Sequence, residues 1–229
     1  MKSLKAWLKK SYTFINFDYL ARRFDFKYVT GVISKLIFEY NHPDTPWLTG
    51  DMILILENYL KPDDIGVEFG SGQSTSWFAS KTKKLISVEH DQYWYKKTKK
   101  ALKTKHLDNK VNYFLIESIN ENDEKDSSKY TSPLKNVRDN SLDYCLVDGL
   151  FREQCILDVI PKLKKGGAII MDNSESYFPK NIVSVSIRYK FNTNPTYSKK
   201  RQKMINTLKT WRCIWTSDAV QDTAMWFKP

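Results

Sequence analysis

The chain has 229 residues, of which 41% are hydrophobic and 28% are charged, and its formal net charge is +11. This length is enough for one α/β domain with a small extension but not for two full domains. No apolar run approaches the roughly 18 residues that a membrane-spanning helix needs, so we expect no transmembrane segment. The positive charge is compatible with a nucleic acid, an anionic membrane surface or an acidic substrate, although the lysines are spread along the chain.

Residues 1–44 are expected to form a helical N-terminal extension or cap. A helix is predicted at residues 29–40. An earlier helix is predicted from apolar residues that recur at near-helical spacing between lysines: Leu4, Trp7, Leu8 and Ile15. The segment could cover the active site, pack on the rest of the chain, or make a weak contact with a membrane surface. No apolar core follows its basic start, and the cysteines are few and widely spaced, so we expect a cytoplasmic chain without a signal peptide.

Predicted strands and helices alternate from residue 45 onwards, which is typical of a parallel sheet in an α/β domain. Helices are predicted at residues 49–60, 74–81, 91–105 and 151–163, and strands at residues 65–69, 84–88, 111–116, 142–147 and 167–171. Two further strands, at residues 211–216 and 223–227, are joined by a short link and predict an antiparallel hairpin. The polar stretch 118–141 interrupts the alternation and holds at most one short helix near residues 130–137, and a second polar stretch covers residues 174–200.

The strongest functional signal is the glycine turn that follows the first strand. Val67-Glu68-Phe69-Gly70-Ser71-Gly72-Gln73-Ser74 runs from a buried strand through two glycines into the start of a helix. Glycine permits a tight turn and a close approach of the backbone to a ligand, and the helix N-terminus directs N–H groups to the same place. Glu89 ends the second strand, 19 residues after Gly70, at the position that binds ribose hydroxyls in nucleotide-binding α/β folds. The pattern therefore predicts an adenosine-type cofactor.

Two details favour a cofactor without phosphate. Thr75 stands where the dinucleotide-binding pattern has its third glycine. Glu68 lies two residues before the first glycine, where a carboxylate is a poor neighbour for a pyrophosphate but a good one for a cationic amino-acid group. S-adenosylmethionine carries an ammonium and a sulfonium and no phosphate.

In these motifs the chain resembles the class I S-adenosylmethionine-dependent methyltransferases, from about Trp47 to the C-terminus. Glu89 matches the family's ribose-binding acid, and Glu117-Ser118 follows the third strand, where the family contacts adenine. The resemblance implies that residues 45–229 form a Rossmann-like, doubly wound α/β domain of seven strands, in the order 3-2-1-4-5-7-6 with the last strand antiparallel. It also implies that the cofactor contacts Glu68, Gly70, Ser71, Gly72, Ser74, Glu89, His90, Ser118 and Asp148.

Acids at the ends of the fourth and fifth strands are the candidates for the chemistry. Asp148 and Asp172 would lie on neighbouring strands about 5 Å apart, and with Asn173 they form an oxygen-rich set suited to Mg²⁺. This set resembles that of the metal-dependent, catechol-type O-methyltransferases, in which the metal orients a substrate hydroxyl and lowers its pKa. That subgroup, however, has a lysine base where this chain has Phe151.

A metal-free alternative remains open at the same place. In that case Asp148 or His42 would be the general base, and Asp172 and Asn173 would only cap the next turn. Arg152, directly after Phe151, could bind an anionic substrate. We lean towards the metal-free alternative, because the lysine that accompanies the metal in the catechol-type subgroup is missing.

The resemblance implies methyl transfer from S-adenosylmethionine, most simply to a hydroxyl of a small molecule or a glycan. The charge of +11 keeps a nucleic-acid methyltransferase acting on RNA ribose as an alternative. The pattern of enzymes that methylate base amines is missing, since the fourth strand is followed by Asp148-Gly149-Leu150-Phe151 instead of Asn/Asp-Pro-Pro and an aromatic residue. A non-catalytic cofactor-binding module is the third hypothesis.

Overall fold

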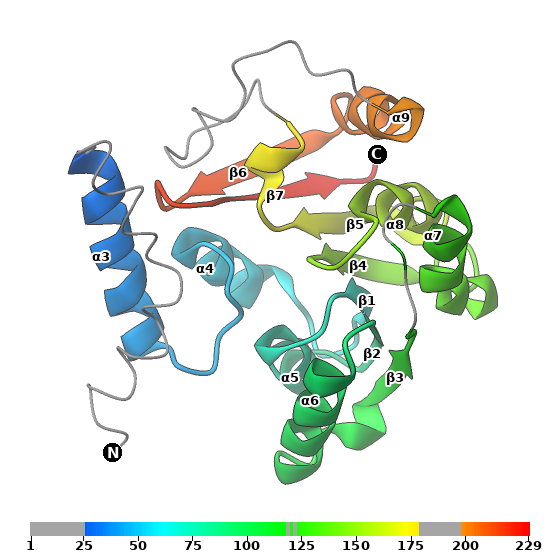
Figure 1. Ribbon diagram of the computed structural model, residues 1–229, viewed down its shortest axis with the longest axis horizontal. Coiled ribbons are helices and arrows are strands. Elements are labelled where there is room, and N and C mark those ends of the chain that lie inside the picture. The colour runs from blue at the N-terminus through cyan, green and yellow to red at the C-terminus, as the bar shows by residue number, and fades with distance from the viewer. Residues whose placement is uncertain (1–25, 118–119, 121–122, 179–197) are drawn as a thin grey trace.

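The structure of the chain is a computed structural model that describes residues 26–117, 120, 123–178 and 198–229; the other residues lie outside the described part. Seven strands form one sheet in the order β3-β2-β1-β4-β5-β7-β6 (Figure 1), which confirms the order expected from the sequence. The strands are β1 (Ile65–Phe69), β2 (Lys84–Glu89), β3 (Val111–Leu115), β4 (Leu142–Val147), β5 (Leu163–Met171), β6 (Arg212–Ser217) and β7 (Asp222–Phe227).

The sheet is parallel except where its last two strands join it. β1 lies between β2 and β4, and the parallel pairing continues to β3 on one side and β5 on the other. β7 runs antiparallel to both β5 and β6, as expected for the last strand. The strand order reverses between β1 and β4, and ligands of open α/β sheets bind outside the carboxyl ends of the strands at such a point.

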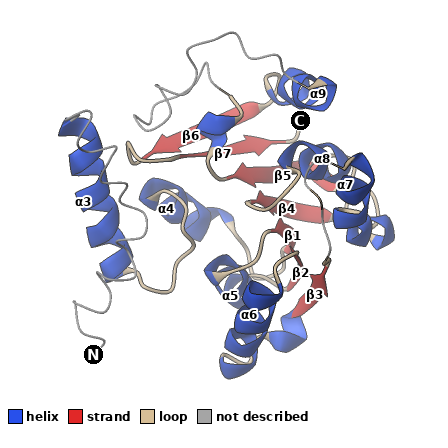
Figure 2. Ribbon diagram, in the orientation of Figure 1, coloured by secondary structure: helices blue, strands red, loops and turns tan. Residues whose placement is uncertain are grey.

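Helices cover both faces of the sheet (Figure 2). Side chains alternate between the two faces along each strand. On one face Cys145 and Val147 of β4 share a core with α7, α8 and α9, and on the other face Tyr144 and Leu146 share a core with α4, α5 and α6. The helices are α3 (Phe26–Asn41), α4 (Gly50–Tyr59), α5 (Gln73–Lys81), α6 (Gln92–Thr104), α7 (Glu124–Tyr130), α8 (Arg152–Val159) and α9 (Lys199–Leu208), with 3₁₀ turns at Asp108–Lys110, Ser132–Asn136 and Ser174–Ser176.

The boundary between α8 and β5 differs from the prediction. The helix predicted to reach residue 163 ends at Val159, close to Pro161, which lacks the N–H that a continuing helix would need. β5 begins at Leu163, four residues before the predicted start at residue 167, because Leu163 already pairs with Leu142 of β4. The sequence pattern thus located both elements but misplaced the border between them.

Two helical segments were also misjudged. The short helix expected near residues 130–137 is a helix that ends at Tyr130 followed by a 3₁₀ turn that contains Pro133. α9 was not predicted at all, because Met204, Ile205 and Leu208 are the only apolar residues of this lysine-rich helix. Three apolar residues within a single turn give too short a periodic pattern to indicate a helix.

The described part of the N-terminal extension packs beside the β6–β7 hairpin. Tyr28 of α3 is buried in a small cluster with Ala219, and Lys35 Nζ donates a hydrogen bond of 2.6 Å to Gln221 Oε1. The predicted helix that carries Trp7, with its possible membrane contact, lies outside the described residues. Within the described ranges, no helix combines the length and the apolar character needed to cross a bilayer.

Candidate functional site

A cavity of about 230 Å³ lies at the carboxyl ends of β1, β2 and β4, at the point where the strand order reverses. Most of the residues predicted to contact a cofactor lie in its wall: Gly70, Ser71, Gly72, Ser74, Glu89, His90 and Asp148. Glu68 does not line the cavity, and Ser118 lies outside the described residues. The sequence motifs therefore converge on one concave site.

The two glycines of the turn have different physical roles. Gly70 has a φ of +91°, and a Cβ there would lie 2.6 Å from the backbone nitrogen of Gly149, so only glycine fits the turn. Gly72 has an extended φ of 174°, and a Cβ there would have no atom within 4 Å. Since Gly72 also lines the cavity, its missing side chain leaves room for a ligand.

Glu89 presents an ionised carboxylate to the cavity. Its Oε2 accepts hydrogen bonds from the Ser71 backbone N–H at 2.9 Å and from Ser71 Oγ at 2.7 Å, and its Oε1 accepts from the N–H groups of His90 and Asp91. Burial alone would raise the pKa of Glu89. The contact of the His90 side chain with Oε1 at 3.0 Å, followed by the hydrogen bonds from Asp91 and Ser71, lowers the pKa to about 2. The carboxylate is therefore charged and fixed in position at neutral pH.

Glu68 supports the glycine turn from below. Its fully buried carboxylate accepts hydrogen bonds from Ser74 Oγ at 3.0 Å, from Ser87 Oγ at 2.7 Å and from Thr75 Oγ1. Thr75, at the position of the missing third glycine, is itself buried, so its hydroxyl joins the start of α5 to the end of β1. Glu68 was interpreted from the sequence as a neighbour of a cationic ligand. In the structure it lies outside the cavity wall and binds the hydroxyl of Ser74, which is part of that wall.

Replacing Glu68 by glutamine should change how stability depends on pH. Burial raises the pKa of Glu68 from its ordinary value of 4.5 to about 7, so ionisation costs more free energy in the folded chain than in the unfolded chain. The contribution of Glu68 to the free energy of unfolding should therefore be largest below about pH 4.5. It should decrease, by at most roughly 3 kcal/mol, as the pH rises to about 7. Urea denaturation from pH 4.5 to 8 should show this loss relative to Glu68→Gln; parallel pH curves would contradict it.

Arg152 connects the acids at the ends of β4 and β5. Its Nη2 donates to Asp148 Oδ1 at 3.0 Å and to the Asp148 carbonyl at 3.1 Å, and its Nη1 donates to the Asp172 carbonyl at 2.5 Å. Its Nε donates to the Gly149 carbonyl at 3.0 Å. Four of the five N–H groups of a guanidinium are thus engaged within the chain, which argues against the idea that Arg152 binds an anionic substrate.

The predicted Mg²⁺ ligands do not form a metal site. Asp148 is already paired with a guanidinium, and the side chain of Asp172 is buried, with Oδ1 accepting a hydrogen bond from Thr223 Oγ1 at 3.0 Å. Asp172 and Asn173 do not line the cavity that contains Asp148. In the described part of the chain, no group of three or more His, Cys, Asp or Glu residues is placed to hold a metal ion. The donor set expected from the sequence therefore does not fit Mg²⁺.

His42, the alternative general base, lies outside the cavity wall. It follows α3, is exposed, and stacks on the ring of Phe38 at a centroid distance of 4.2 Å. Its Nδ1 lies 3.0 Å from the Phe38 carbonyl oxygen. The structure therefore does not bring His42 to the predicted site, and Asp148 is the candidate base that lines the cavity.

Several wall residues were missed from the sequence. Pro46, Trp47 and Leu48, which follow α3, line the cavity together with Trp94 of α6. The rings of Trp47 and Trp94 meet edge to face at 6.0 Å. Trp94 was not assigned to the site, although its place in the first turn of the helix that follows Glu89 was a usable signal. No sequence signal indicated Trp47. The contact that fixes its segment is a hydrogen bond from Gln221 Nε2 to the Trp47 carbonyl, and Gln221 is far away in the sequence.

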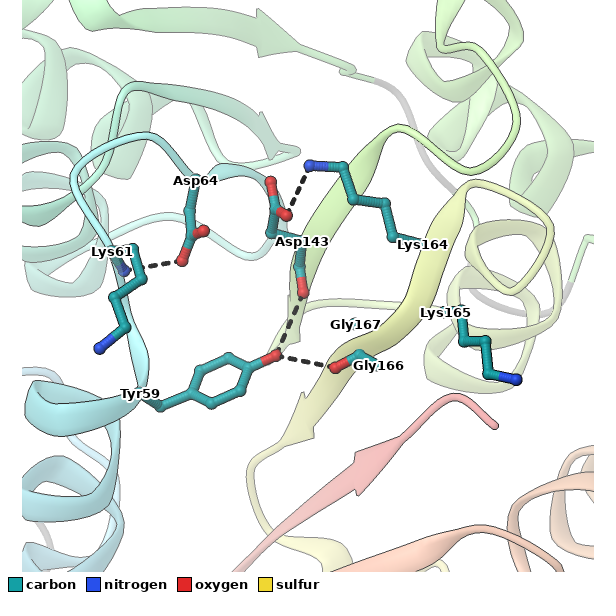
Figure 3. A pocket seen from close by; sticks show the side chains of 8 residues that line it. All are labelled: Tyr59, Lys61, Asp64, Asp143, Lys164, Lys165, Gly166 and Gly167. Atoms are coloured by element: carbon teal, nitrogen blue, oxygen red, sulfur yellow. Dashed lines mark hydrogen bonds and ion pairs between the residues drawn. The ribbon is translucent and has the colours of Figure 1, made fainter.

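A second cavity of about 230 Å³ lies at the amino ends of β1, β4 and β5 (Figure 3). Its polar groups mostly bond to one another: Lys164 Nζ to Asp143 Oδ1 at 2.6 Å, the Tyr59 hydroxyl to the Gly166 carbonyl at 3.2 Å, and the Lys61 N–H to Asp64 Oδ2 at 2.8 Å. Lys165 points away from these groups in Figure 3. These contacts tie the strand ends together, so the functional site is assigned to the opposite end of the sheet.

Comparison with solved structures finds the same fold in known proteins. The chain is 20% identical to a putative caffeoyl-CoA O-methyltransferase from Staphylococcus aureus, with 97% of this chain and 100% of that chain covered and a TM-score of 0.54. A putative O-methyltransferase from Klebsiella pneumoniae is 16% identical (84% and 88% covered, TM-score 0.54). The O-methyltransferase from Bacillus cereus in complex with SAH is 11% identical (93% and 96% covered, TM-score 0.54).

Comparisons of the sequence with protein-family models and with curated proteins find no match. The structural likeness, at identities of 20% and below, concerns the fold. Together with the strand order, it shows that this chain has the Rossmann-like fold of the class I methyltransferases.

Proposed function

We propose that the chain is an S-adenosylmethionine-dependent methyltransferase that methylates a hydroxyl group of a small molecule or a sugar. The observation that carries the proposal is one cavity, at the reversal point of the sheet, that brings together the glycine turn, the ionised Glu89 and the strand-end acid Asp148. The first two are the features that bind an adenosine-type cofactor, and the third is placed to act on an acceptor.

The charge of the cavity wall supports a cationic cofactor without phosphate. Among the described residues that line it, two are acids, Glu89 and Asp148, and none is a lysine or an arginine. A pyrophosphate would meet two carboxylates there and no basic side chain, whereas an ammonium and a sulfonium would be attracted. This argument favours S-adenosylmethionine over a dinucleotide.

Asp148 is the group that supports a hydroxyl acceptor. Methyl transfer from a sulfonium requires alignment of nucleophile, methyl group and sulfur, and removal of a proton when the acceptor is a hydroxyl. The Asp148 side chain is 37% exposed and lines the cavity beside Gly70 and Gly149. This exposure in the cavity wall supports Asp148 as the residue that contacts the acceptor.

Calorimetry with S-adenosylmethionine and with its demethylated product tests the cofactor. Wild type should bind both, and Glu89→Ala should bind roughly 10- to 100-fold more weakly, because a charge-assisted pair of hydrogen bonds to the ribose is lost. Glu57→Ala, which removes an acid on the surface of α4, is the control and should bind normally. No binding by wild type, or equal binding by Glu89→Ala, would contradict the proposal.

A screen with methyl-labelled cofactor tests the acceptor class. The screen should contain phenols, catechols, sugars and RNA, and each acceptor should be assayed in a chelator and with added Mg²⁺. We expect transfer to a hydroxyl compound in both conditions. Transfer only to nitrogen or carbon acceptors would overturn the O-methylation part of the proposal.

A nucleic-acid methyltransferase is the second candidate, and α6 is the observation that favours it. This helix begins beside the cavity with Trp94 and carries no acid between Gln92 and Thr104. Its lysines are Lys96, Lys97, Lys99, Lys100 and Lys103. If RNA is the acceptor, its binding should weaken steeply between 50 and 200 mM salt, on the order of tenfold or more, whereas the turnover of a neutral sugar should change little.

A further inference from the structure

Arg152 holds the ends of two strands and one carboxylate at the same time. Its hydrogen bonds to the carbonyl oxygens of Asp148, Gly149 and Asp172 satisfy backbone groups at the carboxyl ends of β4 and β5. The remaining hydrogen bond goes to Asp148 Oδ1. The Arg152 side chain is only 13% exposed and does not line the cavity. Its position is therefore behind Asp148, away from the ligand space.

The two carboxylate oxygens of Asp148 are consequently in different situations. Oδ1 is bound by the guanidinium. Oδ2 makes no hydrogen bond within the described part of the chain, and the side chain is partly exposed in the cavity wall. A carboxylate that is held at one oxygen and open at the other can take a proton from a hydroxyl group placed in the cavity.

We infer that Arg152 is a positioning residue that takes the place of a divalent cation: it holds Asp148 at Oδ1, opposes the effect of burial on the charged carboxylate and leaves Oδ2 for the acceptor, so that the reaction needs no metal. The inference rests on the proposed function. In the step that it describes, the acceptor O–H gives its proton to Asp148 Oδ2, the oxygen forms a bond to the methyl carbon, and the carbon–sulfur bond breaks to leave the neutral thioether.

Arg201 of α9 is a second arginine that binds backbone carbonyls close to Arg152. Like Arg152, it lies near the ring of Tyr177, at 5.1 Å from the centroid compared with 5.9 Å for Arg152. It also donates to backbone carbonyls, those of Ser176 and Tyr177. Asp148, however, receives no hydrogen bond from it among the described contacts, so Arg201 provides a control of the same residue type and the same neighbourhood.

The kinetic test compares Arg152→Gln, Arg152→Lys and Arg201→Gln at saturating cofactor. Arg152→Gln should lower kcat about 30- to 100-fold, with the acceptor KM and the cofactor Kd changed less than about threefold, because a charge-assisted contact to the reacting carboxylate is lost. Arg152→Lys, which keeps the charge, should recover about tenfold of that loss. Arg201→Gln should change kcat less than about threefold. A loss in Arg152→Gln that lysine does not rescue, or that Arg201→Gln reproduces, would overturn the inference.

A Mn²⁺ titration followed by electron paramagnetic resonance tests the same inference without an acceptor. Wild type should bind no Mn²⁺ at millimolar concentration. One bound Mn²⁺ that is lost in Asp148→Asn would overturn the inference, because the metal and not Arg152 would then hold the carboxylate. Calorimetry with S-adenosylmethionine tests the proposed function separately. Absence of cofactor binding would contradict the proposed function, whereas Mn²⁺ binding at Asp148 would contradict only the role of Arg152.

Discussion

Gly72→Val is expected to abolish S-adenosylmethionine binding while the chain remains folded. A Cβ at Gly72 meets no atom within 4 Å, and the extended φ of 174° is one that valine can adopt. The new side chain would therefore displace no protein atom, but it would fill part of the cavity that Gly72 lines. Calorimetry should show no binding at cofactor concentrations 100-fold above the wild-type Kd.

Two further glycine variants make this result specific. Gly72→Ala places a smaller group in the same space and should weaken binding less than valine does. Gly70→Ala, in contrast, should destabilise the chain, because alanine at φ +91° is strained and its Cβ would lie 2.6 Å from the Gly149 nitrogen. Valine is a poor N-cap residue for α5, so Gly72→Val should also lower the free energy of unfolding by on the order of 1 kcal/mol. Binding is therefore compared below the melting temperature of each variant. Normal binding by Gly72→Val would contradict the placement of the cofactor.

The fold was predictable because its signals are local. The buried strands β1 and β4 were predicted at the residues where the structure places them, since each is a short apolar run bounded by turn residues. Their order in the sheet came from the resemblance of the motifs. The Gly70–Gly72 turn and Glu89 were located together for the same reason, because the turn follows one recognisable strand and Glu89 ends another.

The acceptor side was less predictable, because its contacts join segments that are far apart in the sequence. Arg152 was considered as a binder of an anionic substrate, but its partners include the carbonyl of Asp172, 20 residues away at the end of the neighbouring strand. Trp47 reaches the cavity wall on a segment held by Gln221, 174 residues away. Glu68 fits the motif at its sequence position, yet the hydroxyls of Thr75 and Ser87 hold its carboxylate under the turn. Spacing along the chain cannot reveal such contacts.

Asp148→Asn should lower kcat about 100- to 1000-fold, in the range that a general base contributes. Its amide cannot accept the proton, although it keeps the size of the side chain and can still accept the hydrogen bond from Arg152. The Kd of S-adenosylmethionine should change less than about fivefold, because the glycine turn and Glu89 remain. Single-turnover kinetics and calorimetry measure the two quantities separately. A loss of cofactor affinity as large as the loss of kcat would contradict the assignment of Asp148 to the acceptor.

Asp172→Asn is the control that distinguishes this base from a metal ligand. Burial and the nearby charge of Asp148 raise the pKa of Asp172 to about 7, so the native carboxyl is already partly protonated at neutral pH and an amide is a close substitute. The side chain bonds to Thr223 and not to the cavity. Activity should therefore stay within about threefold of wild type, and chelator should not reduce it further. If Asp172→Asn instead loses activity as severely as Asp148→Asn, and added Mg²⁺ restores it, the two acids act through a shared cation. The Asp148–Arg152 pair would then be only structural.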